Sequence, residues 1–186
     1  MTAETTRHDP PTRGDSEIGP GTADDIWALL SRGAVAGLVA GLAFIVASMY
    51  FADYSGKPTV APFVAISTIF HGSAKPIMTP AALPAEVVTG VIVHLAFSIS
   101  FGIGFAVVAR AARRVVHNLP TLVAAALVYG TLLWVLNFEI LGRTAFKFFS
   151  NPHGPNITFQ GIIHPFIFGL FLVPFFVKPL RSKARS

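Results

Sequence analysis

The chain has 186 residues, of which 53% are hydrophobic and only 12% are charged. Ordinary soluble proteins carry about twice that share of charge, so this chain needs lipid as the solvent for much of its surface. Its lack of cysteine excludes disulfides, iron–sulfur clusters, c-type haem attachment and thiolate metal sites. The formal net charge of +5 does not indicate nucleic-acid binding, because the Lys and Arg residues lie beside the ends of apolar runs, where they orient helices and contact anionic lipid head groups.

The N-terminal segment, from Met1 to about Ala28, is rich in Thr, Pro, Gly and Asp and shows no hydrophobic period. Such a segment cannot bury enough apolar surface to offset its ordering entropy, so we predict a disordered cytoplasmic tail over residues 1–28. A signal peptide is not expected, because a signal has a basic start directly followed by a short apolar stretch. Residues 29–180 are predicted to form the membrane domain and residues 181–186 a basic cytoplasmic tail.

Four apolar runs follow the tail, each of about 20 residues or more, which at about 1.5 Å per residue is enough to cross the roughly 30 Å hydrocarbon layer. The runs are Gly33–Ala52, Val87–Ala109, Leu119–Phe138 and Ile157–Val177. The third is expected to begin with Asn118 as its N-cap and with Pro120 in its first turn, where proline is tolerated. Pro165 and Pro174 are expected to kink the fourth. The fold class is therefore an all-α integral membrane protein with four transmembrane helices.

Lys and Arg residues near the ends of the runs predict the orientation, because cytoplasmic flanks carry the excess of positive charge. Ten lie on the side of the two termini and of the connection between the second and third runs, against four on the other side. Those four are Lys57, Lys75, Arg143 and Lys147. The sequence predicts a multi-pass protein of the cell (inner or plasma) membrane with both termini cytoplasmic.

The two outer connections are longer. The first contains the apolar piece 61–66, which is too short to span and predicts an interfacial or re-entrant helix, followed by an extended run from Pro76 to Pro84. The second holds Phe146, Phe148 and Phe149 around Lys147, an aromatic and basic mixture typical of the head-group level.

The order of the histidines suggests an internal duplication. The first and third runs lack histidine, and each is followed by an outer connection that carries one, at His71 and His153. The second and fourth runs each contain one, at His94 and His164. Two two-helix halves in the same orientation would form a parallel repeat.

His94 and His164 are the main candidate site residues. Each lies seven residues after the start of its run, so both are expected at the same depth, about 10 Å below the outer boundary. Ionisable groups in hydrocarbon are costly and usually face the bundle interior. We therefore expect the two imidazoles to face one another across the core.

Two chemical interpretations of this pair are open. One is a b-type haem held by both imidazoles, which needs matched depth on facing helices; Gly90 and Gly161 would leave room for its flat ring. The other is a divalent-metal or proton-transfer site, completed by Glu139 or by a histidine of the outer connections, His71 or His153.

The structural interpretation is that each imidazole bonds a neighbouring carbonyl or hydroxyl, for example the Gly161 carbonyl that Pro165 frees, or the Ser98 hydroxyl. Glu139 also has a plain alternative to ligation, an interfacial i, i+4 ion pair with Arg143.

Small residues at four-residue spacing mark the first two helices. Gly33, Gly37 and Gly41 form one stripe, and Ser98, Gly102 and Ala106 continue the face of His94. Such stripes let helix backbones approach closely, so the first helix is expected to pack on the second.

The segment from Gly90 to Gly102, with His94 in it, resembles the second helix of the YagU-like small bacterial inner-membrane proteins. The glycine-rich start of the first helix and the sequence Gly161-Ile162-Ile163-His164 also resemble that family. The resemblance implies a four-helix inner-membrane protein linked to acid or envelope stress, with no established catalytic residues to carry over.

Three functions are compatible with these features. One is a small bundle that binds a haem or metal at His94 and His164 for electron or proton transfer. The second is a non-enzymatic structural, accessory or envelope-stress membrane protein, in a homo-oligomer or a larger membrane complex. The third is a minimal transporter that acts as an oligomer. Phosphate loops, dinucleotide fingerprints, GxSxG and HExxH are missing from the sequence, so it offers no support for an enzyme.

Overall fold

The computed structural model describes residues 23–71 and 78–177, which form helices and turns and no strand. In chain order the elements are α1 Ala23–Tyr54, α2 Ala61–His71, α3 Leu83–Ala111, α4 Leu119–Trp134, η1 Val135–Leu141, α5 Gly142–Thr144, η2 Lys147–Ser150, α6 Ile157–Ile163, η3 His164–Gly169, α7 Leu170–Leu172 and η4 Val173–Phe175. Of these, η1 and η3 are π-helical, whereas η2 and η4 are 3₁₀ turns.

Four stretches of the described chain are long and apolar enough to cross a membrane, which confirms the predicted all-helical fold with four candidate membrane-spanning helices. They are Asp25–Tyr54, Leu83–Ala111, Leu119–Thr144 and Ile157–Phe175. The first helix begins earlier than predicted, because α1 starts at Ala23, inside the segment assigned to the tail. The rest of that tail and the basic tail at 181–186 lie outside the described residues.

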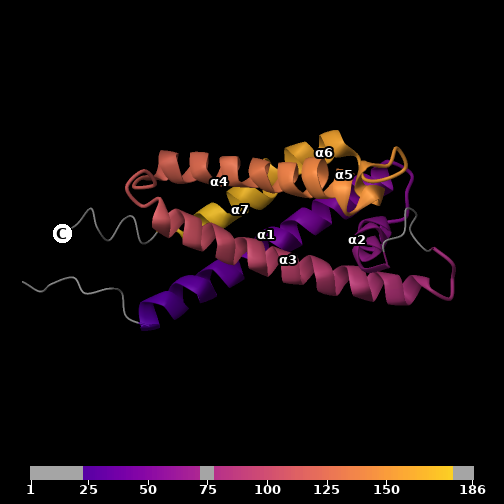
Figure 1. The fold of residues 1–186 in the computed structure, drawn as a ribbon, viewed down its shortest axis with the longest axis horizontal. Helices are drawn as coiled ribbons and strands as arrows, with labels where there is room; N and C mark the ends of the chain where they lie inside the picture. Colours follow the sequence, from indigo (N-terminus) through magenta and orange to yellow (C-terminus); the bar gives the residue numbers. More distant parts are fainter. Residues whose placement is uncertain (1–22, 72–77, 178–186) are drawn as a thin grey trace, which may run out of the picture.

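The helices α1 and α3 cross and pack against one another (Figure 1). At the crossing, a Cβ added to Gly37 would lie 2.8 Å from the Cα of Gly102, and one added to Gly102 would run into the Gly33 carbonyl and the Cα of Gly37. Only glycine allows two backbones to approach so closely. The predicted packing of the first transmembrane helix on the second is therefore confirmed.

A second close contact joins α4 to η3. A Cβ at Gly130 would collide with the His164 carbonyl and come within 2.6 Å of the Cα of Pro165. The α-helical pattern changes at both prolines of this last helix: Pro165 lies in η3 and Pro174 in η4. Proline has no N–H for the i to i−4 bond and crowds the preceding turn, so the breaks fall where kinks were expected.

The helix α2 lies between the diverging ends of α1 and α3, at the end of the bundle where α1 ends and α3 begins (Figure 1). We call this end of the molecule the α2 end. Gly90 of α3 leaves room for α2 because it has no side chain: a Cβ there would collide with the Phe63 carbonyl. The short helix expected in the first connection is thus present, and its place relative to the bilayer stays a prediction.

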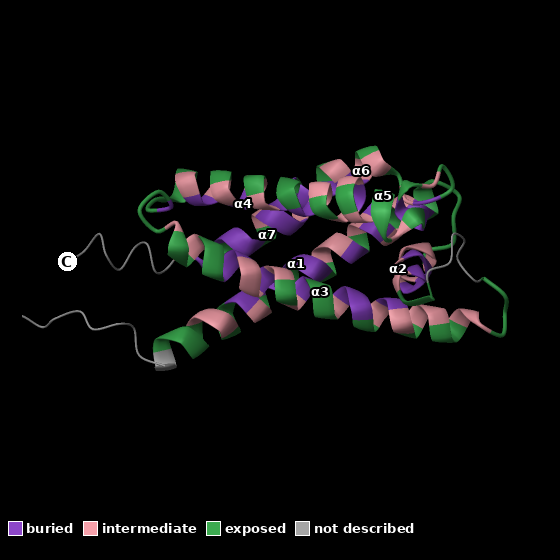
Figure 2. Ribbon diagram, viewed as in Figure 1, coloured by how far each residue is buried: buried purple, intermediate pink, exposed green. Residues whose placement is uncertain are grey.

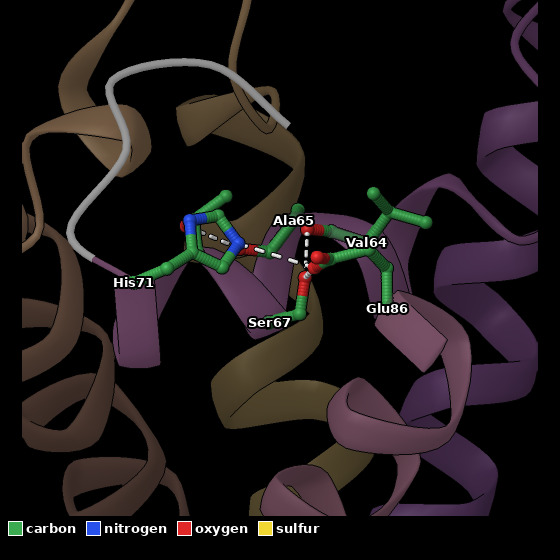
Figure 3. A network of polar contacts seen from close by, with 6 residues as sticks. Val64, Ala65, Ser67, His71 and Glu86 are labelled. Carbon is green, nitrogen blue, oxygen red and sulfur yellow. Dashed lines mark hydrogen bonds and ion pairs between the residues drawn. The ribbon is translucent and has the colours of Figure 1, made fainter. Parts of the chain in front are cut away.

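Polar contacts fasten α2 to α3. The Ser67 hydroxyl donates to the Glu86 carboxylate, and His71 Nε2 lies 3.1 Å from the same carboxylate oxygen (Figure 3). The segment from Pro76 to Pro84 was predicted to be extended, which is wrong from Thr79 onward. There the N–H groups of Ala82 and Leu83 donate to the Thr79 carbonyl at 3.0 and 2.9 Å, forming a turn.

Buried residues lie mainly on the helix faces turned toward the other helices, and exposed residues lie on the outer faces (Figure 2). Many of the exposed residues are large and apolar. Val46, Ile92 and Leu132 are exposed, as expected for surfaces solvated by lipid. Phe148 and Phe149 were predicted at the head-group level. Their level relative to the bilayer stays a prediction. In the structure both rings are buried in the protein, where the Phe149 ring packs edge-on against Phe138 with centroids 5.6 Å apart.

Candidate functional site

A cavity of about 690 Å³ lies at the α2 end, among α1, α2, α3, η1, η2 and the α6–η3 helix. Its lining is mainly apolar and aromatic. The polar side chains that reach it are Ser48, Ser55, Lys57, His94, Ser98, Asn137, His153, Asn156, Gln160 and His164. A concave, largely apolar space with a few polar groups is the usual form of a small-molecule site.

His94 joins two helices at the inner part of this cavity. Its Nε2 lies 2.9 Å from the Gly41 carbonyl of α1 and 3.5 Å from the Ser98 hydroxyl on its own helix. A Cβ at Gly41 would collide with the Ser98 side chain, so the glycine stripe of α1 is what brings the carbonyl within reach of the ring. His94 is 8% exposed, and its hydrogen bond crosses the α1–α3 interface.

His164 is bonded within its own helix instead. Its Nδ1 lies 2.8 Å from the carbonyl of Gln160, four residues earlier, and the residue is 6% exposed. This ring is the first side chain of η3, where the chain leaves the α-helical pattern.

Phe44 of α1 contacts both imidazoles. Its ring is stacked on His94 with centroids 6.1 Å apart and meets His164 edge-on at 4.6 Å. The two histidines therefore line one cavity, with an aromatic ring against both of them. That the two imidazoles face one another stays a prediction.

The other predicted ligands do not join the pair. Glu139 forms an ion pair with Arg143 at 2.6 Å, which is the plain alternative anticipated above. His71 is bonded to Glu86 and does not line the cavity, whereas His153 does. Within residues 23–71 and 78–177, no group of three or more His, Asp or Glu side chains is arranged to hold a metal ion.

The hydrogen bonds of the two rings bear on cofactor binding. A metal-bound imidazole usually gives its other nitrogen to a carbonyl or carboxylate, and each ring does bond a carbonyl. A porphyrin held between the rings does not fit the described side chains, because Phe44 lies against both imidazoles. A metal would find two histidines here, fewer than the three or four protein ligands usual for zinc.

Ser–His chemistry is also not supported by the contacts of His94. Its Nε2 can satisfy the Gly41 carbonyl only by donating a proton to it, so the same nitrogen cannot accept a proton from the Ser98 hydroxyl. The described geometry thus holds a histidine beside a serine without making the serine a nucleophile.

Ser48 and Lys57 are cavity residues that sequence reasoning did not single out. Ser48 is 5% exposed, and its hydroxyl has no hydrogen-bond partner among the described residues. A signal for it exists in the sequence, since Ser48 lies seven residues after Gly41, two turns further along the same face of the helix. Lys57 follows the end of α1, and only the fold brings it to the rim of the cavity.

Comparisons with protein-family models, with curated proteins and with solved structures find no match to this chain. The resemblance to the YagU-like proteins therefore stays a prediction. The function has to be argued from the cavity.

Proposed function

We propose that the protein binds a small, largely apolar molecule in the cavity at the α2 end, with Ser48, His94 and His164 as polar contacts at its inner part. The observation that carries this proposal is the buried, unpartnered hydroxyl of Ser48, which lines a mainly apolar cavity. Leaving a buried hydroxyl without a partner costs about 1–3 kcal/mol. A polar atom of a bound molecule would offset that cost.

The size and chemistry of the cavity support this proposal. Ligand pockets in proteins range over about 300–1,000 Å³ and use few polar groups to fix orientation, and the volume of about 690 Å³ lies within that range. His94 and His164 each use one ring nitrogen on a carbonyl. The remaining nitrogen of each ring forms no hydrogen bond with the described residues, so both rings can bind a polar atom of the ligand.

The proposal includes the placement of the protein in the cell (inner or plasma) membrane with both termini in the cytoplasm. It is supported by the excess of Lys and Arg near the other end of the bundle, at Arg32 and at Arg110, Arg113 and Arg114. In this orientation the cavity lies toward the outer side.

A parallel two-helix repeat is part of the same proposal. Each pair of transmembrane helices has a short helical element in its connection, α2 in the first pair and η2 in the second. In each pair the second helix supplies a histidine to the cavity.

The test is native mass spectrometry of the detergent-purified protein, with oleyl alcohol as an added neutral apolar probe. We expect the wild-type protein to retain the probe and Ser48→Ala to retain several-fold less, since it loses the unpartnered hydroxyl. The matched control is Ser100→Ala, which removes an exposed hydroxyl bonded to the Ala96 carbonyl at 2.8 Å, outside the cavity lining. Equal retention by both variants, or no retention by the wild type, would contradict the proposal.

An absorption spectrum of the same sample tests the exclusion of haem. Without a bis-imidazole haem, we expect no Soret band from cells supplied with haem. A Soret band that is lost in both His94→Leu and His164→Leu would overturn the conclusion drawn from Phe44.

A further inference from the structure

A second, smaller hollow adjoins the cavity at its rim. It has a volume of about 360 Å³ and is lined by Lys57 and by the polar turn over residues 150–158. The two spaces share four lining residues, Lys57, Gly154, Pro155 and Asn156. An apolar space thus continues into a polar one, with a lysine at the boundary.

The charge at this boundary is one-sided. Among the described residues that line the two hollows, Lys57 is the only Lys or Arg, and none is Asp or Glu. The contact that Lys57 makes through its side chain is a long hydrogen bond, 3.3 Å from Nζ to the Gly154 carbonyl. It forms no ion pair with a described residue. An ammonium group has several donors, so Lys57 has donors left for an anion.

We propose that the two hollows together hold one anionic amphiphile, whose carboxylate or phosphate binds Lys57 and whose hydrocarbon chain enters the cavity toward Ser48. This inference rests on the proposed function and specifies the class of molecule bound. A neutral molecule would leave the ammonium group of Lys57 without an anion. A free inorganic anion would leave the apolar cavity unused.

The experiment compares two probes that share a chain and differ in the head group, oleate and oleyl alcohol. Binding of each to the purified protein in neutral detergent is measured by native mass spectrometry. A charge pair at an exposed lysine is worth up to about fivefold in affinity, so we expect oleate to bind about fivefold more tightly than oleyl alcohol. Lys57→Gln should remove that preference.

The matched control is Lys147→Gln. Lys147 is also exposed and lies on η2 at the α2 end, but it lines neither hollow, so this variant should keep the preference for oleate. Because Lys57 is exposed as well, both substitutions are expected to leave the fold intact. The thermal unfolding temperature checks this.

Three outcomes overturn the inference, and they are distinguishable. Equal binding of oleate and oleyl alcohol, unchanged in Lys57→Gln, removes the anionic head group and leaves the proposed function standing. Binding of neither probe removes both proposals. Competition by inorganic phosphate as effective as by lysophosphatidic acid shows a simple anion site and removes the amphiphile.

Discussion

The α1–α3 pair and the α4–η3 pair both pack through glycine, but the two pairs differ in backbone conformation. The first pair is made of regular α-helices of 32 and 29 residues, and glycines of the two helices face one another at the crossing. In the second pair both helices contain a π-helical segment, η1 and η3, and Gly130 packs on the distorted backbone at His164 and Pro165.

The two buried histidines follow the same division. The His94 ring reaches across to the Gly41 carbonyl of the other helix, whereas the His164 ring bonds the Gln160 carbonyl of its own. A hydrogen bond between helices contributes to their association, and one within a helix only sets the direction of the ring. The first pair is therefore joined by close backbone packing and by a hydrogen bond between its helices, and the second supplies the π-helical segments that are frequent at functional sites.

The largest effect is expected from Gly102→Leu, which disrupts the α1–α3 crossing directly. The new side chain would collide with the backbone of Gly33 and Gly37, which cannot move aside as a side chain can. We expect a loss of about 3 kcal/mol or more in the free energy of unfolding, measured by denaturation of the protein in mixed micelles.

The control for this change is Gly104→Leu on the same helix, where a Cβ would meet only the hydroxyl end of Tyr129, at 2.8 Å, and its neighbouring ring carbon. It should cost clearly less. Equal stability of the two variants would show that the close α1–α3 crossing does not contribute the expected stability to the fold.

An intermediate effect is expected from Glu86→Ala, which removes the acceptor that fastens α2 to the first pair. Ser67 and His71 both lose their carboxylate partner (Figure 3). We expect a loss of about 1 kcal/mol, because the pair is partly exposed, and faster amide hydrogen exchange over residues 61–71.

Glu139→Ala provides the comparison in the second pair, because it removes an exposed i, i+4 ion pair with Arg143. Such pairs contribute about 0.5 kcal/mol or less, and exchange in α2 should not change. If Glu139→Ala released α2 as well, the contacts of Glu86 would not be the cause.

The smallest effect distinguishes the two histidines. His94→Leu removes a hydrogen bond between transmembrane helices, which is worth about 0.6 kcal/mol on average and up to about 1.7. His164→Leu removes a bond within one helix and should cost less in the free energy of unfolding. A larger loss for His164→Leu, measured in the same unfolding assay, would reverse the assignment of the two rings.

Much of the fold could be predicted because it depends on local patterns. The lengths of the apolar runs predict the four candidate spans, and the stripe of Gly33, Gly37 and Gly41 predicts the α1–α3 contact. Asn118 also caps α4 as expected, its side chain accepting the Thr121 N–H at 3.0 Å. Each of these features needs only the spacing of residues along one helix.

The rest of the site depends on tertiary contacts that spacing along one helix does not contain. A helical repeat of 3.6 residues assigns faces only while the α-pattern continues, and it does not continue through η1 and η3. The same limit explains why the burial of Phe148 and Phe149 could not be predicted. That the Ser48 hydroxyl has no partner and that Lys57 reaches the rim follow from the packing of several elements around one cavity.

The π-helical segment η1 has a consequence for how the chain tolerates changes in length. The N–H of Gly142 bonds the Asn137 carbonyl five residues earlier, rather than four. Deleting one residue from a regular α-helix rotates everything beyond it by about 100°. A π-turn holds one residue more than an α-turn, so deleting one residue within η1 would restore the α-pattern and leave Phe148 and Phe149 facing the protein. The chain is therefore expected to tolerate a one-residue deletion within η1 better than one in the middle of α3.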